Sequence, residues 1–202
     1  MCGKFIDNIE VVDVSSKGKG VCKDESGKVI FVDGVVPGDI INLKIKRKRK
    51  NYFEGQKIEI LKPSKNRITP KCKHFELCGG CKFQNMSYDA QLQFKQKQIL
   101  NNLKNFSKMD IPKISRIKKA NKIYFYRNKM EFSFSEQKWL TKEEINKKNQ
   151  NITRKGLGFH KSGAWNKVID ITKCHLQKDP SNEIRNSIRD FAIKNSFKFF
   201  DH

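Results

Sequence analysis

Three cysteines lie within ten residues of this 202-residue chain, and their spacing restricts how the surrounding segment can fold. The motif CKHFELCGGC occupies residues 72–81, so Cys72, Cys78 and Cys81 follow a C-x5-C-x2-C pattern. Glycines between the last two thiols allow the backbone to turn tightly around a common centre, as a set of metal ligands requires. A fourth ligand is then needed, and Cys174 is the cysteine that remains outside the N-terminal region.

Two kinds of metal centre compete for these cysteines. A zinc site usually takes two paired knuckles and often accepts histidine, and His74 and His175 lie next to candidate cysteines. Three clustered cysteines with one remote cysteine are more typical of a 4Fe-4S cluster, which we expect here, with zinc as the alternative metal. The C-x3-C-x2-C triplet of radical S-adenosylmethionine enzymes does not occur in the sequence, so that chemistry is disfavoured.

The first residues of the chain lack the apolar stretch of a secretory signal peptide, so we expect the protein in the cytoplasm. Disulfides are rare in that compartment, which favours metal binding for the six cysteines. No run approaches the roughly 18 apolar residues that a membrane span needs, so we expect no membrane partner.

Basic residues are concentrated in one segment. The chain has 43 Lys and Arg against 21 Asp and Glu, a formal net charge of +22, which indicates a polyanionic partner. The net charge is −2 over residues 1–43 and rises to +10 over residues 44–73. A solvated hairpin or loop is one explanation of this step. We expect instead that the side chains at its centre contact nucleic-acid phosphates and release counterions: Lys46, Arg47, Lys48, Arg49 and Lys50.

Short apolar runs separated by turn residues indicate a small β structure in the first sixty residues. The runs lie at residues 9–14, 28–32, 40–45 and 57–61, and the glycines at 18 and 20 read as a flexible corner. About five strands in this length predict an OB-like barrel, a fold that often binds nucleic acid.

This first region resembles a TRAM domain, the small RNA-binding barrel found on several RNA-modifying enzymes. The likeness is carried by Gly18, Gly20, the run VIFV at residues 29–32 and the turn PGD at residues 37–39. The resemblance implies RNA as the partner, with no DNA specificity.

The cysteine motif and the residues after it are similar to the iron–sulfur class of RNA (uracil-5-)-methyltransferases. The likeness continues in the family's order through the sequence KFQ at residues 82–84, YRNKMEFSF at 126–134, GFH at 158–160 and VIDI at 168–171, which leads into Cys174. The best-known members act on large-subunit ribosomal RNA, which implies a ribosomal RNA target. The resemblance also implies that four residues bind a 4Fe-4S cluster that organises the fold and RNA binding: Cys72, Cys78, Cys81 and Cys174.

Members of this family methylate uracil with a cysteine nucleophile, a base and S-adenosylmethionine, all held by a downstream domain. This sequence shows no glycine-rich strand-to-helix turn of the expected type and no cysteine after Cys174. We therefore expect an N-terminal portion of such an enzyme that is unable to transfer methyl alone. The alternative is a stand-alone, non-catalytic RNA-binding protein with a structural zinc or iron–sulfur site.

The expected fold class is α+β, and we expect a monomer. A five-stranded OB-like barrel at residues 1–63 is followed by a cysteine segment at 64–86 and an incomplete α/β central domain at 87–202, which supplies the fourth cysteine.

Two helices are predicted in the central domain. One begins after Ser87, and its apolar stripe is expected to pack in a core: Leu92, Ile99, Leu103 and Phe106. The other begins near Pro180 and has an apolar face: Ile184, Ile188, Phe191 and Ala192.

Strands are predicted elsewhere in this domain. Residues 124–134 indicate a strand pair in which Arg127 and Lys129 lie beside aromatic rings, a combination that can bind phosphates and stack on unpaired bases. Further strands are expected at residues 155–160 and 167–171. The three phenylalanines among the last six residues suit a strand entering a sheet.

Overall fold

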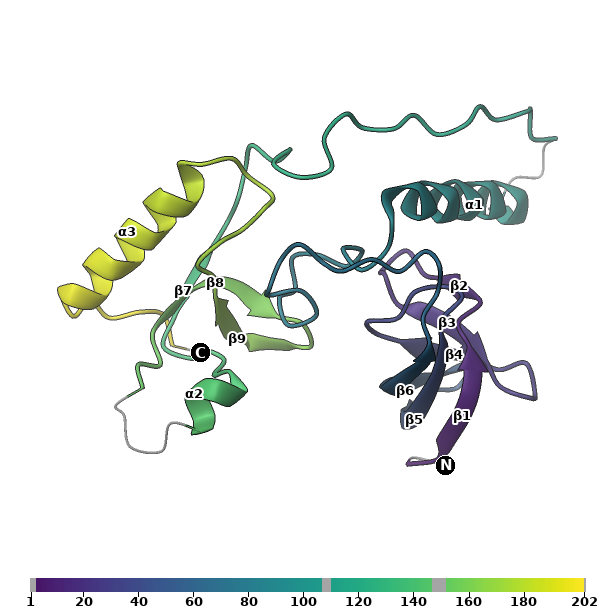
Figure 1. Ribbon diagram of the computed structural model, residues 1–202, viewed down its shortest axis with the longest axis horizontal. Coiled ribbons are helices and arrows are strands. Elements are labelled where there is room, and N and C mark those ends of the chain that lie inside the picture. The colour runs from purple at the N-terminus through teal and green to yellow at the C-terminus, as the bar shows by residue number, and fades with distance from the viewer. Residues whose placement is uncertain (1–2, 107–109, 147–151, 202) are drawn as a thin grey trace. The chain divides into compact units, whose positions relative to one another are not determined.

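The chain forms two compact units in a computed structural model that describes residues 3–106, 110–146 and 152–201 (Figure 1). The first unit consists of residues 1–70 and 82–121, and the second of residues 71–81 and 122–202. These units divide the predicted cysteine segment 64–86, because the residues after Cys81 pack with the first unit. Phe83 and Met86 do so through contacts with Val36 and its neighbours.

The first unit is built on a six-stranded sheet of order β1-β5-β6-β4-β3-β2. Its strands are β1 (Phe5–Glu10), β2 (Asp13–Val14), β3 (Gly20–Lys23), β4 (Val29–Val32), β5 (Ile40–Lys48) and β6 (Tyr52–Lys62). All neighbours are antiparallel except β4 and β6, which are parallel.

The sheet curls because two residues join its opposite edges. Val11 and Val12 connect β1, which pairs with β5, to β2, which pairs with β3. The N–H of Val11 donates to the carbonyl of Asp39 at 2.9 Å, and the N–H of Val12 donates to that of Val21 at 2.8 Å. Both edges of the sheet therefore meet at this dipeptide.

The strand count corrects the sequence-based prediction of five. The run at residues 9–14 is not one strand, because Val11 and Val12 bond to different neighbours. Gly20 starts a strand instead of forming a flexible corner, and a Cβ there would lie 2.2 Å from Val35 Cγ2. Gly18 does form a turn, with a φ of 76° that glycine adopts at little cost.

The main core of this unit is a cluster of apolar side chains, and the carboxylate of Asp39 is also buried in the unit. Alternate residues of the strands point inward, as the period of two requires, and the buried set is Val11, Cys22, Ile30, Val32, Val35, Ile41, Leu43, Ile45 and Phe53. Asp39 is completely buried and accepts hydrogen bonds from the backbone N–H groups of Val36 and Ser64 and from Nε of Arg67 at 3.0 Å. Burial opposes its ionisation, but these bonds and the charge of Arg67 outweigh it and lower the pKa of the carboxyl.

Helix α1 spans Tyr88–Phe106, and its buried side chains lie only in its first turns. Ala90 and Leu92 are buried, whereas Ile99, Leu103 and Phe106 are exposed, Phe106 by 85%. The prediction of a fully packed stripe is therefore wrong for the described residues. The neighbours that pack on the helix, such as Met86 and Val36, lie only at its beginning.

The second unit holds a three-stranded antiparallel sheet of order β7-β8-β9. Its elements are β7 (Ser133–Ser135), α2 (Lys142–Asn146), β8 (Gly156–Lys161), β9 (Ala164–Asp170) and α3 (Ser181–Lys194). The strand pair predicted at residues 124–134 is wrong except for its end. The N–H groups of Phe125 and Arg127 donate instead to the carbonyls of His175 and Leu176, both at 2.8 Å.

The buried face of helix α3 is not the apolar face that the sequence pattern predicts. Ala192 is buried, but Ile184, Ile188 and Phe191 are each at least half exposed. The other buried side chains of the helix are Asn182 and Arg185. Among the final aromatics, Phe199 is buried against Phe134, while Phe197 and Phe200 are exposed and no residue from 195 to 201 lies in a strand.

None of the helices in the described ranges combines the length and apolar character needed to cross a membrane.

Candidate functional site

Four cysteines come together in the second unit. Cys78 and Cys174 are buried in one apolar cluster, and Cys81 packs against it. Cys72 is near enough for its thiol to interact electrostatically with those of Cys81 and Cys174. We call these four residues the cysteine centre. Cys22 lies apart, in the core of the first unit, and Cys2 lies outside the described residues.

The loop that carries three of these cysteines is fixed to the end of β8. The N–H of Gly79 donates to the carbonyl of His160 at 2.9 Å, and the N–H of Ser162 donates to that of Leu77 at 2.9 Å. A Cβ on Gly79 would lie 2.9 Å from the same His160 oxygen, and one on Gly80 would lie 3.3 Å from the ring of Phe159. Both glycines are needed for this close approach.

The fourth cysteine is held by helix α3. The N–H of Cys174 donates to Oδ1 of Asn182 at 2.7 Å, and Nδ2 of Asn182 donates to the carbonyl of Cys174 at 3.1 Å. This two-way pairing fixes the turn after β9 against the first turn of the helix. Within the motif, the N–H of Gly80 donates to Sγ of Cys78 at 3.3 Å, so that sulfur already accepts a hydrogen bond.

Three thiols of the cysteine centre, those of Cys72, Cys78 and Cys174, are hard to ionise without a cation. Burial raises the pKa of Cys78 to about 11, and the neighbouring thiols act in the same direction. Burial also raises the pKa of Cys72 and of Cys174. Since metal ligation uses the thiolate, a bound metal would displace protons from these sulfurs and supply the missing positive charge.

The residues present fit an iron–sulfur group in their donor chemistry. Four sulfur donors are the usual set for a 4Fe-4S cluster, and three buried nitrogens nearby have no hydrogen-bond partner: His74 Nε2, His175 Nδ1 and Arg185 Nη1. A buried donor without a partner is costly. Across residues 3–106, 110–146 and 152–201, no three His, Cys, Asp or Glu side chains are arranged as ligands of a single metal ion. A four-iron cube is wider than one zinc ion and holds its thiolates farther apart.

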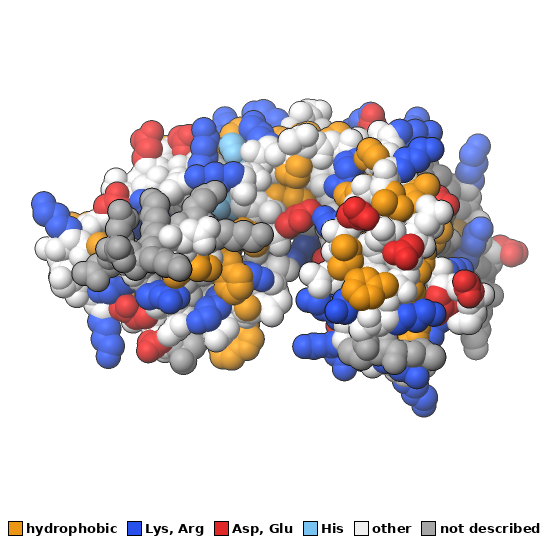
Figure 2. All heavy atoms as spheres, turned by 60° about the horizontal axis from the view of Figure 1, so that its bottom comes forward, with side chains coloured by type: hydrophobic (Ala, Val, Ile, Leu, Met, Phe, Trp, Pro, Cys, Tyr) orange, Lys and Arg blue, Asp and Glu red, His pale blue; other side chains and the backbone are white. Residues whose placement is uncertain are grey.

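The predicted phosphate-binding residues form an exposed hairpin in the first unit. Residues 46–50 cover the end of β5 and the turn before β6, and all five are exposed. Arg49 forms an ion pair with Glu54, with Nε and Oε1 3.2 Å apart. Figure 2 shows Lys and Arg side chains spread widely over the visible face, with fewer Asp and Glu among them.

A groove of about 720 Å³ lies beside this hairpin and was not evident from the sequence. Lys48 lines it together with Phe5, Lys28 and Phe53. Nζ of Lys28 lies 4.6 Å from the centre of the Phe53 ring. Charge over an aromatic ring is a combination that binds unpaired nucleotides. The signal that points to it is the basic end of β5, which is followed by Tyr52 and Phe53 at the start of β6.

Arg127 and Lys129 belong to the second unit, whereas the hairpin at residues 46–50 belongs to the first. Both side chains are exposed, and Lys129 pairs with Glu131 at 2.9 Å. Arg127 lies near the cysteine centre, where its charge acts on the thiol of Cys174.

Known proteins resemble this chain over most of its length. Residues 7–58 match the TRAM domain family. An uncharacterised RNA methyltransferase of Bacteroides thetaiotaomicron is 42% identical over 188 residues, which cover 93% of this chain and 41% of that protein. The 23S rRNA (uracil(1939)-C(5))-methyltransferase RlmD of Legionella pneumophila is 31% identical over 170 residues, covering 83% of this chain and 37% of that enzyme. The sequence of this chain is therefore similar, over most of its length, to about two-fifths of these RNA methyltransferases.

The fold of this chain is also found in a solved structure. The Pyrococcus abyssi tRNA (uracil-54, C5)-methyltransferase, crystallised with S-adenosyl-L-homocysteine, matches 96% of this chain and 38% of its own chain, with a TM-score of 0.58 and 22% identity. The chain spans about two-fifths of the length of the curated relatives it matches. The predicted TRAM region and the mixed α+β fold are thereby confirmed.

Proposed function

We propose that this chain is the RNA-binding and iron–sulfur portion of an S-adenosylmethionine-dependent RNA (uracil-5-)-methyltransferase that acts on ribosomal RNA in the cytoplasm. The observation that carries the proposal is the grouping of the cysteine centre in a homologue of RNA methyltransferases. A protein that only binds RNA through a basic barrel has no need of four converging thiols.

In this proposal, Cys72, Cys78, Cys81 and Cys174 hold a 4Fe-4S cluster. When bound, the cluster supplies a covalent cross-link between the motif loop and the turn after β9. The chain's own contribution is to present the sulfurs. The glycines at 79 and 80 allow the loop to approach β8, and Asn182 fixes the position of Cys174. We assign the cluster a structural role because two of its proposed ligands, Cys78 and Cys174, are buried.

The TRAM region contributes the RNA contact. We propose that its curled sheet is an OB-type barrel and that the hairpin at residues 46–50 neutralises phosphates. The groove beside it, with Phe5 and Phe53, would receive an unpaired base. Arg127 and Lys129 add phosphate contacts from the second unit.

The chemistry of methyl transfer belongs, in this proposal, to parts of the relatives that this chain does not cover. More than half of the length of each relative lies outside the part that matches this chain. The cysteines of the described part are either grouped in the cysteine centre or, like Cys22, buried in a core. We therefore expect the chain alone to bind RNA without transferring a methyl group.

A binding and transfer assay tests this division. The chain, purified without oxygen, should bind a ribosomal RNA fragment that contains unpaired uridines, with an affinity that falls as salt is raised. It should incorporate no label from S-adenosylmethionine carrying a tritiated methyl group. Failure to bind RNA at low salt contradicts the RNA-binding part, and methyl incorporation contradicts the assignment of catalysis to another region.

The second candidate function is a non-catalytic RNA-binding protein with a structural zinc site. One observation favours it: His74 and His175 lie next to ligand cysteines and each has a buried nitrogen without a hydrogen-bond partner. Burial lowers the pKa of both imidazoles, so each is neutral and able to ligate at pH 7. Stoichiometric zinc retained by the chain, and lost when His74 is changed to Ala, would favour this candidate.

A further inference from the structure

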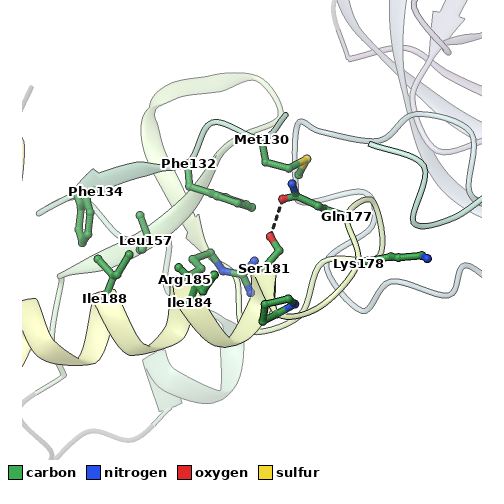
Figure 3. Close-up of a pocket in the computed structure, with 11 residues that line it drawn as sticks. Met130, Phe132, Phe134, Leu157, Gln177, Lys178, Ser181, Ile184, Arg185 and Ile188 are labelled. Carbon is green, nitrogen blue, oxygen red and sulfur yellow. Dashed lines mark hydrogen bonds between the residues drawn. The ribbon is translucent and has the colours of Figure 1, made fainter. Parts of the chain in front are cut away.

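Helix α3 buries an arginine and leaves its aliphatic residues exposed. Arg185 is 4% exposed, whereas Ile184 and Ile188 are 54% and 50% exposed. Figure 3 shows the three side chains on this helix, where they and Phe132 line a cavity of about 490 Å³. A charged residue is almost never this deeply buried unless something compensates its charge.

Most donors of Arg185 are used to hold the turn that leads to Cys174. Nε donates to the carbonyl of Ile171 at 3.0 Å, and Nη2 donates to that of Thr172 at 2.9 Å. The guanidinium carbon also lies 4.8 Å from the centre of the Phe132 ring. These contacts fix the side chain, but they involve only neutral groups, so they leave its charge unbalanced.

No carboxylate in the described residues forms an ion pair with Arg185. The nearby Asp170 pairs with Arg189 instead, at 3.5 Å. Nη1 of Arg185 is buried and has no hydrogen-bond partner. A buried charge without a partner costs several kilocalories per mole in general, so a protein retains one where an anion is present in the working state.

The cysteine centre is the anionic group that acts most strongly on Arg185: the charge of Cys174 favours the guanidinium more than the charges of Asp170 and Asp179 do. Oδ1 of Asn182 accepts hydrogen bonds both from Nη2 of Arg185, at 3.0 Å, and from the N–H of Cys174, at 2.7 Å. One oxygen atom therefore joins the guanidinium to the backbone of a proposed ligand. Burial raises the pKa of the Cys174 thiol, and the charge of Arg185 opposes that effect. Four thiolates around a 4Fe-4S core give a net charge of about −2.

We propose that Arg185 is the positioning residue and the counter-charge of the cysteine centre. It holds the turn that carries Cys174, and its buried positive charge balances the negative charge of the thiolate-bound group. The inference rests on the proposed function, since it takes the four cysteines as ligands. It adds that the affinity and the redox potential of the bound group depend on a residue that does not ligate it, as outer hydrogen bonds and charges do at other metal sites.

Three variants of the full chain separate the charge from the hydrogen bonds. Arg185→Gln removes the positive charge and keeps a hydrogen-bond donor. Arg185→Lys keeps the charge but loses the paired donors of the guanidinium group. Lys194→Gln is the control and removes an exposed charge from the same helix. Each is loaded with iron and sulfide without oxygen. The midpoint potential and the rate of metal loss to a chelator are then measured, and circular dichroism checks the fold.

The expected result is a more negative midpoint potential and about tenfold faster metal loss for Arg185→Gln. Arg185→Lys should keep the wild-type potential, and Lys194→Gln should match wild type in both. A folded Arg185→Gln chain with wild-type potential and release rate overturns the proposal. If that variant does not fold, the lysine variant decides, and a potential shifted from the wild-type value overturns the counter-charge role.

The proposed function fails in a different way. A wild-type chain that retains neither iron nor zinc overturns the cysteine ligands and the role of Arg185 together. A wild-type chain that retains only zinc overturns the cluster. The rate of zinc release from Arg185→Gln then tests the counter-charge, because four thiolates around zinc are also anionic.

Discussion

Cys22 and Cys78 are both buried thiols, but the regions around them are built in opposite ways. Cys22 lies in the core of the first unit, where aliphatic side chains surround it and the one buried carboxylate has all its partners. Cys78 lies in the cysteine centre, beside other thiols and near buried nitrogens without partners. The first region is complete with protein atoms alone. In the described part of the second, three buried nitrogens have no hydrogen-bond partner in the protein.

The largest expected effect is loss of the bound metal. Changing Cys78 to Ser should reduce the iron content of the purified chain to near zero, because a buried hydroxyl does not replace a thiolate ligand. Changing Cys22 to Val should leave it unchanged. Iron is measured per folded chain by elemental analysis. Equal iron loss in the two variants would contradict the contrast between the two regions.

In the first unit, the largest effect is expected at Asp39. Asp39→Asn should lower the free energy of unfolding by about 3–5 kcal/mol, because it leaves Arg67 without its buried partner. Asp33→Asn is the matched control: it breaks an exposed pair with Lys19 and should cost at most about 1 kcal/mol. Urea unfolding measures both. Similar values for the two would show that the Asp39 network does not stabilise the core.

Asp39 and Cys22, both buried in this unit, are expected to limit its stability at opposite ends of the pH range. The lowered pKa of Asp39 contributes stability above pH 3.8, and that contribution is lost as pH falls through the lower folded-state pKa. Burial, followed by the charge of Asp39, raises the pKa of Cys22 to about 12. Its unfolded form ionises first, so stability should fall by roughly 1.4 kcal/mol per unit as pH rises above 9.

Replacing Cys22 with Val tests the alkaline limit. The variant should lose less stability than wild type between pH 9 and pH 11 in urea unfolding, since the contribution of the Cys22 thiol, which ionises first in the unfolded state, is removed. Parallel pH profiles for the two chains would show that the thiol of Cys22 does not set this limit.

The smallest effect is expected at the basic hairpin. Changing Lys46, Arg47 and Lys48 together to Gln should reduce the slope of log affinity for single-stranded RNA against log salt by about 2. The control changes Lys178, Lys194 and Lys198, which are exposed in the second unit. Equal changes in slope would indicate that RNA responds to net charge alone and not to this hairpin.

Spacing and local chemistry predicted part of this structure. Thiols at C-x5-C-x2-C, followed by a distant cysteine, could be expected to converge, and turn residues marked most strands of the first unit. Hydrophobic periodicity did not predict which helix side chains are buried, because burial depends on tertiary contacts. The stripe on α1 continues past its packing partners, so Ile99 and Phe106 stay exposed.

The inward face of α3 could not be predicted from periodicity either. Asn182 and Arg185 are polar, and inside the fold they donate hydrogen bonds to the carbonyls of Cys174 and Ile171, which lie far from them in any helical repeat. The N–H groups of Phe125 and Arg127 donate to the carbonyls of His175 and Leu176 instead of forming a local strand pair. A pairing between segments so far apart in sequence leaves no local pattern.

The iron and acid-labile sulfide content of the wild-type chain, purified without oxygen, tests the central claim most directly. About four iron and four sulfide per chain, with broad absorption at about 400 nm, are the predicted result. A colourless, folded chain that contains zinc, or no metal, would contradict it.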